Sequence, residues 1–177
     1  MLYTSRYDSP LGGILLAGDD EALTGLWFDG QKYFADTLPA QHAARETPVF
    51  DAAKRWLDVY FPGERPDFTP PVKWEATPFR SAVWEILVSV PYGTTVTYAE
   101  IASRIARQRG LAHMSAQAAG SAVAHNPISL IVPCHRVVGT DGSLTGYAGG
   151  IGKKLRLLEL ERVDTSRFFI PKKGTAL

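Results

Sequence analysis

Apolar and polar residues alternate at the start of the chain in a pattern typical of a small antiparallel sheet. Short alternating runs cover residues 2–7, 13–17 and 23–28, and turn-forming residues separate them. From Thr47 the spacing of the apolar residues becomes helical, and it stays so until Pro62-Gly63. A sheet followed by one helix predicts a first lobe of α+β type.

Helical spacing returns after this lobe and predicts a mostly helical second half. Thr77-Pro78 is suited to the cap and first turn of one helix, and residues 97–100 match a capping box at the head of another. Ser115 is placed to cap a third helix that ends near His125. The last two are predicted to form a helix-turn-helix, although their connection, residues 108–114, is longer than usual for that unit.

The third of these helices is almost without large side chains, because alanine, glycine and serine fill most of residues 116–125. A helix with such a surface can approach its partner closely. Composition leaves two partners open: the minor groove of DNA, widened by bending, or another part of the protein.

A buried strand is predicted for residues 128–132, just before Pro133 and the single cysteine, Cys134. Residues 140–143 carry a turn signal. A glycine-rich loop then leads into a last helix, on which apolar residues share one side with Glu161.

Charge is divided unevenly along the chain. Residues 1–75 carry seven Lys and Arg against twelve Asp and Glu, a formal charge of −5, and residues 76–177 carry twelve against six, or +6. This asymmetry suits a polyanionic partner for the second part, and equally an uneven distribution of solvated charge. We expect an α+β lobe with a proline-rich linker over 1–75, a second domain over 76–164 and a tail over 165–177.

No apolar stretch approaches the roughly 18 residues of a membrane span, and the N-terminus lacks the apolar segment of a secretion signal. We therefore expect a soluble, cytoplasmic protein. One cysteine cannot form an internal disulfide or a cysteine-rich zinc site, so neither a metal nor a cofactor is predicted.

Cys134 is the first candidate for chemistry, although a lone cysteine is more often an inert buried residue. A thiolate is the reactive form, and an imidazole oriented by a carboxylate can generate it, so His135 and Glu161 are candidate partners. Adjacent residues of an extended chain point to opposite sides. Cys134 and His135 therefore need a turn or a bridging water, and Pro133 favours a departure from strand geometry.

A set of linked segments surrounds this cysteine. They are Asn126-Pro127, IVPCHRVVG over residues 131–139, SLTGYAGG over residues 143–150, and then Lys154, Leu157-Leu158 and Glu161. Over about residues 77–161 the chain resembles the O6-alkylguanine-DNA alkyltransferase family, also called methylated-DNA–protein-cysteine methyltransferases, and the first lobe fits that family's N-terminal domain in length and pattern. The resemblance implies a ribonuclease H-like first lobe and a winged helix-turn-helix-like domain for DNA binding and catalysis.

The resemblance implies a role for each matching residue in the transfer chemistry. Cys134 is the alkyl acceptor and attacks the alkyl carbon on guanine O6. His135 deprotonates the thiol through a bound water, and Glu161 orients His135. Asn126 braces the active-site turn, and Tyr98 donates a hydrogen bond to the flipped base and helps to protonate the leaving guanine.

Further residues are placed around the substrate base by the same resemblance. Tyr147 packs on the base, the amide of Ala148 faces O6, and the Val137 carbonyl receives the exocyclic amine. Ser129 stands where some relatives have proline, which indicates a roomier pocket.

The implied DNA contacts come mainly from the small-residue helix. The helix residues are Ser115, Ala116, Gln117, Ala118, Gly120 and Ser121. Arg136, the arginine that closes the motif, is added to the DNA contacts, and we also assign it a structural role. Gln117 stands where many relatives carry an arginine that fills the gap left by the flipped base. Attraction to phosphates is then expected from Arg104, Arg107, Arg109, Lys153 and Lys154.

The resemblance implies repair of DNA by direct reversal of the damage: the protein takes the alkyl group irreversibly, in one turnover. It implies a monomer that binds alkylated double-stranded DNA through the minor groove, and a cytoplasmic location at the nucleoid. O6-alkylguanine and O4-alkylthymine are the implied substrates, and the base is flipped before transfer. A non-enzymatic lesion sensor is the main alternative, and Cys134 argues against it. Without the resemblance, a cysteine hydrolase or a sequence-specific winged-helix regulator would also fit.

Overall fold

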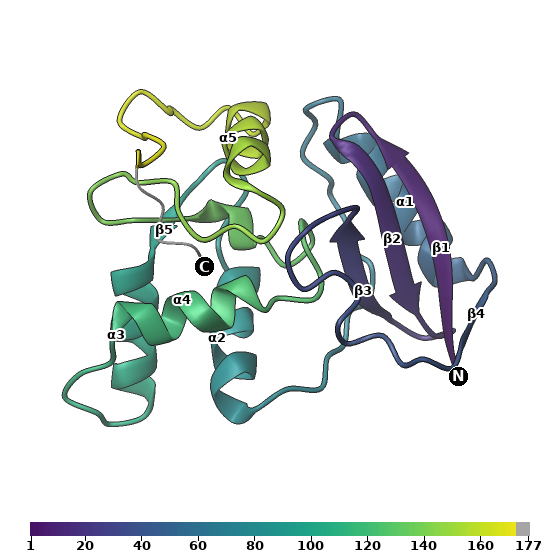
Figure 1. Cartoon of the computed structure of the whole chain (residues 1–177), viewed down its shortest axis with the longest axis horizontal. Helices are drawn as coiled ribbons and strands as arrows, with labels where there is room; N and C mark the ends of the chain where they lie inside the picture. Colours follow the sequence, from purple (N-terminus) through teal and green to yellow (C-terminus); the bar gives the residue numbers. More distant parts are fainter. Residues whose placement is uncertain (173–177) are drawn as a thin grey trace. The chain divides into compact units, whose positions relative to one another are not determined.

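The computed structural model describes residues 1–172, so the end of the predicted tail, 173–177, lies outside the described residues. The chain divides into two compact units, which Figure 1 shows in the colours of the sequence. The first contains Met1–Trp74 and the short segment Pro127–Ile131, and the second contains Glu75–Asn126 and the chain from Val132 onward.

The first unit contains a four-stranded sheet in the order β3-β2-β1-β4. The strands are β1 (Leu2–Ser9), β2 (Gly12–Gly18), β3 (Leu23–Phe28) and β4 (His42–Ala44). The first three pair antiparallel, which confirms the prediction, whereas β4 was not predicted and pairs parallel with β1. The sheet is therefore mixed. All three residues of β4 are exposed, so no alternation of apolar and polar residues marks this edge strand.

Helix α1 (Pro48–Tyr60) lies against one face of this sheet (Figure 1). It begins as predicted, because the Thr47 side chain accepts a hydrogen bond from the Phe50 N–H and Pro48 needs no partner in the first turn. Phe50 and Leu57 on the helix are fully buried, as are Ile14 and Leu26 on the sheet. These apolar side chains form the core of the unit.

Backbone hydrogen bonds on β3 tie two further segments into the first unit. The end of the proline-rich stretch is attached, because Leu23 donates to the Pro71 carbonyl (2.8 Å) and accepts from Lys73 (2.9 Å). Residues 128–132 do not form the predicted strand: Ile128 makes one isolated bridge to Leu26. Leu130 has a φ of 71°, which is incompatible with continuing a strand.

The second unit is mostly helical, as the apolar spacing predicted. Its elements are α2 (Pro78–Val88), β5 (Val96–Thr97), α3 (Tyr98–Gln108), α4 (Ala116–Ala124), a 3-10 turn (Cys134–Arg136), β6 (Val137–Val138) and α5 (Ile151–Leu160). Thr97 and Glu100 form the predicted capping box of α3, and Ser115 caps α4 through the Ala118 N–H. Strands β5 and β6 pair parallel, which places the head of α3 beside the chain that leaves Cys134.

The indole of Trp84 on α2 donates to the Ala122 carbonyl of α4 (2.8 Å), and α4 also packs on α3. Ala119, Ala122 and Val123 are buried by this packing. Among the described residues, no helix is long and apolar enough to cross a membrane.

Candidate active site

Cys134 begins a 3-10 turn rather than continuing an extended chain. The Cys134 N–H donates to the Val132 carbonyl (2.9 Å), and the Arg136 N–H donates to the Pro133 carbonyl (3.1 Å). Asn126 braces the same turn, because its side-chain amide also donates to the Val132 carbonyl (2.8 Å). The turn supplies the departure from strand geometry that Pro133 predicted.

Glu161, at the end of α5, gathers three hydrogen-bond donors around one buried carboxylate. His135 bonds to Oε2 through its Nε2, Arg136 donates to Oε1 from Nε (2.8 Å), and the Gly93 N–H donates to the same oxygen (3.0 Å). His135 and Glu161 are both almost completely buried. The structure therefore brings together the histidine and the carboxylate that the sequence proposed as partners.

The charges of this cluster follow from burial and hydrogen bonding. Burial alone would raise the pKa of Glu161, but the bonds from His135 and Arg136 outweigh it and hold that pKa below its usual range. Burial lowers the pKa of His135, and its bond to Glu161 opposes the shift only in part. The carboxylate is thus charged and the imidazole neutral near pH 7, so the imidazole can accept a proton.

Burial raises the pKa of the Cys134 thiol, so the residue rests largely as a thiol. A hydrogen bond from Asn126 and the charge of Lys154 act in the opposite direction, as do the backbone N–H groups of Cys134 and His135. These groups stabilise the thiolate once a base removes the proton.

Arg136 does not belong with the DNA-contacting residues. Its side chain is 7% exposed, and besides Glu161 it donates from Nη1 to the Val90 carbonyl (2.8 Å). The guanidinium also lies over the ring of Tyr92. Arg136 ties the turn after α2 to the end of α5, which corrects its assignment to DNA. Sequence reasoning missed Val90 and Gly93, because backbone acceptors and donors carry no residue-type signal.

A second buried group joins α3, α5 and the glycine-rich loop. The Tyr98 hydroxyl donates to the Thr145 carbonyl (2.8 Å), and Lys154 Nζ donates to the same oxygen (2.7 Å). Burial raises the pKa of Tyr98, so its hydroxyl remains a donor. Lys154 is 0% exposed, and the expectation that it attracts phosphates was wrong. The spacing of residues in the sequence did not distinguish the buried Lys154 from its half-buried neighbour Lys153.

The residues expected around the substrate base lie on separate segments of the chain. Tyr147 is buried in the loop before α5, and Gly149 allows this placement, because a Cβ there would lie 2.7 Å from the Tyr147 ring. Ala148 is half-buried beside it, and Val137 is buried in β6. Ser129 belongs to the first unit, where its N–H donates to the Leu26 carbonyl (3.0 Å).

Helix α4 presents only part of its surface to solvent. Ser115, Ala116, Gln117 and Ser121 are exposed, and Ala118 is half-buried. Gly120 is buried, and its contact with DNA stays a prediction. One face of the helix therefore packs inside the protein, which is one of the two alternatives left open by composition, and the other face is accessible.

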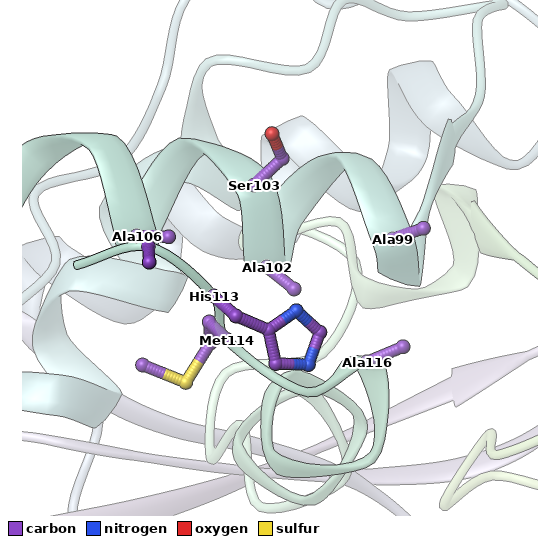
Figure 2. Close-up of a pocket in the computed structure, with 8 residues that line it drawn as sticks. Ala99, Ala102, Ser103, Ala106, His113, Met114 and Ala116 are labelled. Carbon is purple, nitrogen blue, oxygen red and sulfur yellow. The ribbon is translucent and has the colours of Figure 1, made fainter.

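The long connection between α3 and α4 and the facing side of α3 line an open pocket of about 250 Å³ (Figure 2). Small side chains of α3 form one wall, and His113 and Met114 of the connection form another. Arg104, Arg107 and Arg109 are exposed on and after α3. Among the described residues, no cluster of three or more His, Cys, Asp or Glu side chains could hold a metal ion.

Two family models match the chain. The ribonuclease-like domain of 6-O-methylguanine DNA methyltransferase matches residues 2–74, and the DNA binding domain of the same family matches residues 78–163. The methylated-DNA–protein-cysteine methyltransferase of Haemophilus influenzae is 39% identical over 163 residues, which cover 92% of this chain and 87% of the relative. Its counterpart from Methanosarcina acetivorans is 42% identical over 161 residues, or 90% and 98% of the two chains.

Solved structures of O6-methylguanine methyltransferases are also similar to this chain in sequence and fold. The crystal structure of Mycobacterium tuberculosis O6-methylguanine methyltransferase is 40% identical to this chain, with a TM-score of 0.76 and coverage of 98% of this chain and 97% of that one. The crystal structure of Mycobacterium tuberculosis OGT in complex with DNA is 41% identical, with a TM-score of 0.75 and coverage of 94% of each chain.

Proposed function

Because the chain belongs to the O6-methylguanine DNA methyltransferase family, we propose that Cys134 is the residue that accepts the alkyl group in the family's reaction. The activity is that of a methylated-DNA–protein-cysteine methyltransferase, which repairs alkyl damage by direct transfer to a cysteine. Cys134 is the only cysteine in the chain. The observation that carries the proposal is the buried pair of His135, on the turn that Cys134 begins, and Glu161, at the end of α5.

In the proposed step the Cys134 thiolate attacks the alkyl carbon on guanine O6. The S–C bond forms as the C–O6 bond breaks, and the electron pair of that bond passes to the guanine. His135 takes the thiol proton through a water molecule, and Glu161 fixes the ring orientation and stabilises the imidazolium that forms. Since Glu161 bonds to Nε2, Nδ1 is the ring nitrogen that exchanges this proton.

Neutral guanine leaves more readily than its anion, so a proton donor lowers the barrier. Tyr98 is proposed as this donor, and burial keeps its hydroxyl protonated. Tyr147 packs on the base, the Ala148 amide faces O6, and the Val137 carbonyl receives the exocyclic amine. Ser129 in place of proline is proposed to leave more room for the alkyl group.

DNA binding is proposed to use the exposed face of α4, namely Ser115, Ala116, Gln117, Ala118 and Ser121. The related Mycobacterium tuberculosis protein has been solved in complex with DNA, which supports a DNA partner here. The substrate is alkylated double-stranded DNA, entered from the minor groove by a monomer, and the nucleoid is the site of action. A stacked base cannot present O6 to a buried thiol, so the nucleotide must be flipped out.

We extend the same chemistry to O4-alkylthymine, whose alkyl carbon is also bound to an exocyclic oxygen. The thioether product is stable, so each molecule reacts once. A regulator would not need Cys134, and a cysteine hydrolase would turn over many times.

The DNA product tests this function. A duplex with one O6-methylguanine is incubated with limiting protein, and its nucleosides are analysed. We expect guanine to be restored in an amount equal to the protein added, and none to be restored by Cys134→Ala. An abasic site, a shortened strand, or restoration beyond the amount of protein would contradict direct transfer.

A further inference from the structure

Lys154 is a buried cation whose only role described so far is the effect of its charge on the Cys134 thiolate. Its side chain is fully buried, and among the ion pairs of residues 1–172 none includes it. Burying an ammonium without a carboxylate is unfavourable. A lysine kept in such a place, close to reacting groups, is therefore a candidate for function.

Lys154 and Tyr98 share one acceptor, the Thr145 carbonyl. Lys154 Nζ lies 2.7 Å from this oxygen and 3.4 Å from the Tyr98 hydroxyl, and it sits over the Tyr98 ring at 5.5 Å from the centroid. A tyrosine hydroxyl has one proton to donate, whereas an ammonium has three. Tyr98 therefore cannot donate to Thr145 and to a substrate base at the same time.

We propose that Lys154 is the positioning residue for Tyr98: it keeps the Thr145 carbonyl hydrogen-bonded while the Tyr98 hydroxyl turns to the leaving guanine. The inference rests on the proposed function. As the S–C bond forms and the C–O6 bond breaks, the proton of Tyr98 passes to the guanine. The ammonium of Lys154 then lies beside the phenolate and returns a proton to it, and solvent reprotonates the lysine afterwards.

The surroundings of Lys154 suit this exchange. The titratable groups that interact with it are Tyr98 on α3 and Cys134 and His135 on the 3-10 turn. Burial lowers the pKa of Lys154 to about 7, and a thiolate at Cys134 acts to raise it. Proton transfer to a neighbouring phenolate is thus easier than from an exposed lysine.

A double-mutant cycle separates this role from a structural one. Single-turnover rates are measured with excess protein and a duplex carrying one O6-methylguanine, for the natural protein, Lys154→Met, Tyr98→Phe and the double variant. We expect Lys154→Met to slow transfer about tenfold or more in the natural background and by a clearly smaller factor in the Tyr98→Phe background, where only its charge effect on the Cys134 thiolate is lost. Equal fold-losses in both backgrounds would overturn the proposal, because Lys154 would then act independently of Tyr98.

Thermal unfolding of all four proteins checks that they fold. If Lys154→Met does not fold, Lys154→Leu takes its place in the cycle. Lys32→Met, at an exposed lysine of the first unit, is the matched control and should transfer at the natural rate. The natural protein tests the underlying activity in the same experiment. No transfer by that protein would contradict the proposed function, whereas normal transfer with an additive cycle would contradict only the role of Lys154.

Discussion

At the scale of single residues, Glu161 holds the candidate site together, because one carboxylate accepts from His135, Arg136 and Gly93. Glu161→Gln keeps the shape and removes the charge, so the buried guanidinium of Arg136 loses its counter-ion. We expect a loss of about 3 kcal/mol in the free energy of unfolding, measured with urea, together with slower transfer. Glu159→Gln, on the exposed side of α5, should change stability by less than about 0.5 kcal/mol.

The effect of Glu161→Gln has a defined pH dependence. Since the folded state lowers the pKa of Glu161, the stabilising contribution is complete above the unfolded pKa of about 4.3 and is lost as the pH falls through the folded value. The stability difference between the natural protein and the variant should therefore shrink below about pH 4. A difference that stays constant down to acid unfolding would show that the carboxylate charge is not what stabilises the cluster.

The lowered pKa of Lys154 predicts that the free energy of unfolding also depends on pH above neutrality. The folded pKa of about 7 lies below the ordinary value, so between about pH 7 and pH 10 the unfolded chain binds more protons than the folded one. Stability should rise with pH across this range, by an amount on the order of a few kcal/mol. Urea unfolding at pH 7 and pH 9.5 measures it. The rise should be smaller in Lys154→Met, and equal rises in both proteins would contradict the buried charge.

At the scale of elements, α4 combines a buried face with an exposed one that carries Gln117. A glutamine can hydrogen-bond an orphaned base but adds no charge. We expect Gln117→Arg to tighten DNA binding and to steepen the dependence of log Kobs on log salt by about one unit. Binding titrations at several salt concentrations give these slopes.

The control for that substitution is Gln41→Arg, which adds the same charge at an exposed position of the first unit. Its slope should remain that of the natural protein if α4 carries the DNA contact. A slope unchanged by Gln117→Arg, or steepened equally by Gln41→Arg, would show that α4 is not the contact surface.

Element prediction succeeded where a local signal marked an end. Helices α1 to α4 begin where the sequence predicted, at Thr or Ser residues whose side chains cap them. Such caps can be predicted from sequence because a capping side chain bonds within the first turn of its own helix. Element prediction failed at β4 and at residues 128–132. An exposed edge strand has no apolar face to detect, and a run of apolar residues fits a buried irregular segment as well as a strand.

At the scale of the whole molecule, the linked motif around Cys134 allowed the family and the His135–Glu161 pair to be predicted from sequence, because those residue types are tied to one chemistry. The burial of Arg136 and Lys154 could not be predicted. A cationic residue in a sequence usually indicates a solvated surface, and only the fold shows that the carbonyls of Val90 and Thr145 accept hydrogen bonds from Arg136 and Lys154.

The central claim is that Cys134 itself receives the alkyl group, and intact mass followed by peptide mapping tests it most directly. The natural protein and Cys134→Ala are incubated with excess duplex carrying one O6-methylguanine. We predict that the natural chain gains one methyl group, located on the peptide that contains Cys134, and that the variant gains none. An unchanged mass with lesion binding retained would contradict the account and indicate a lesion sensor, and a methyl group on any other residue would contradict the assignment of the acceptor.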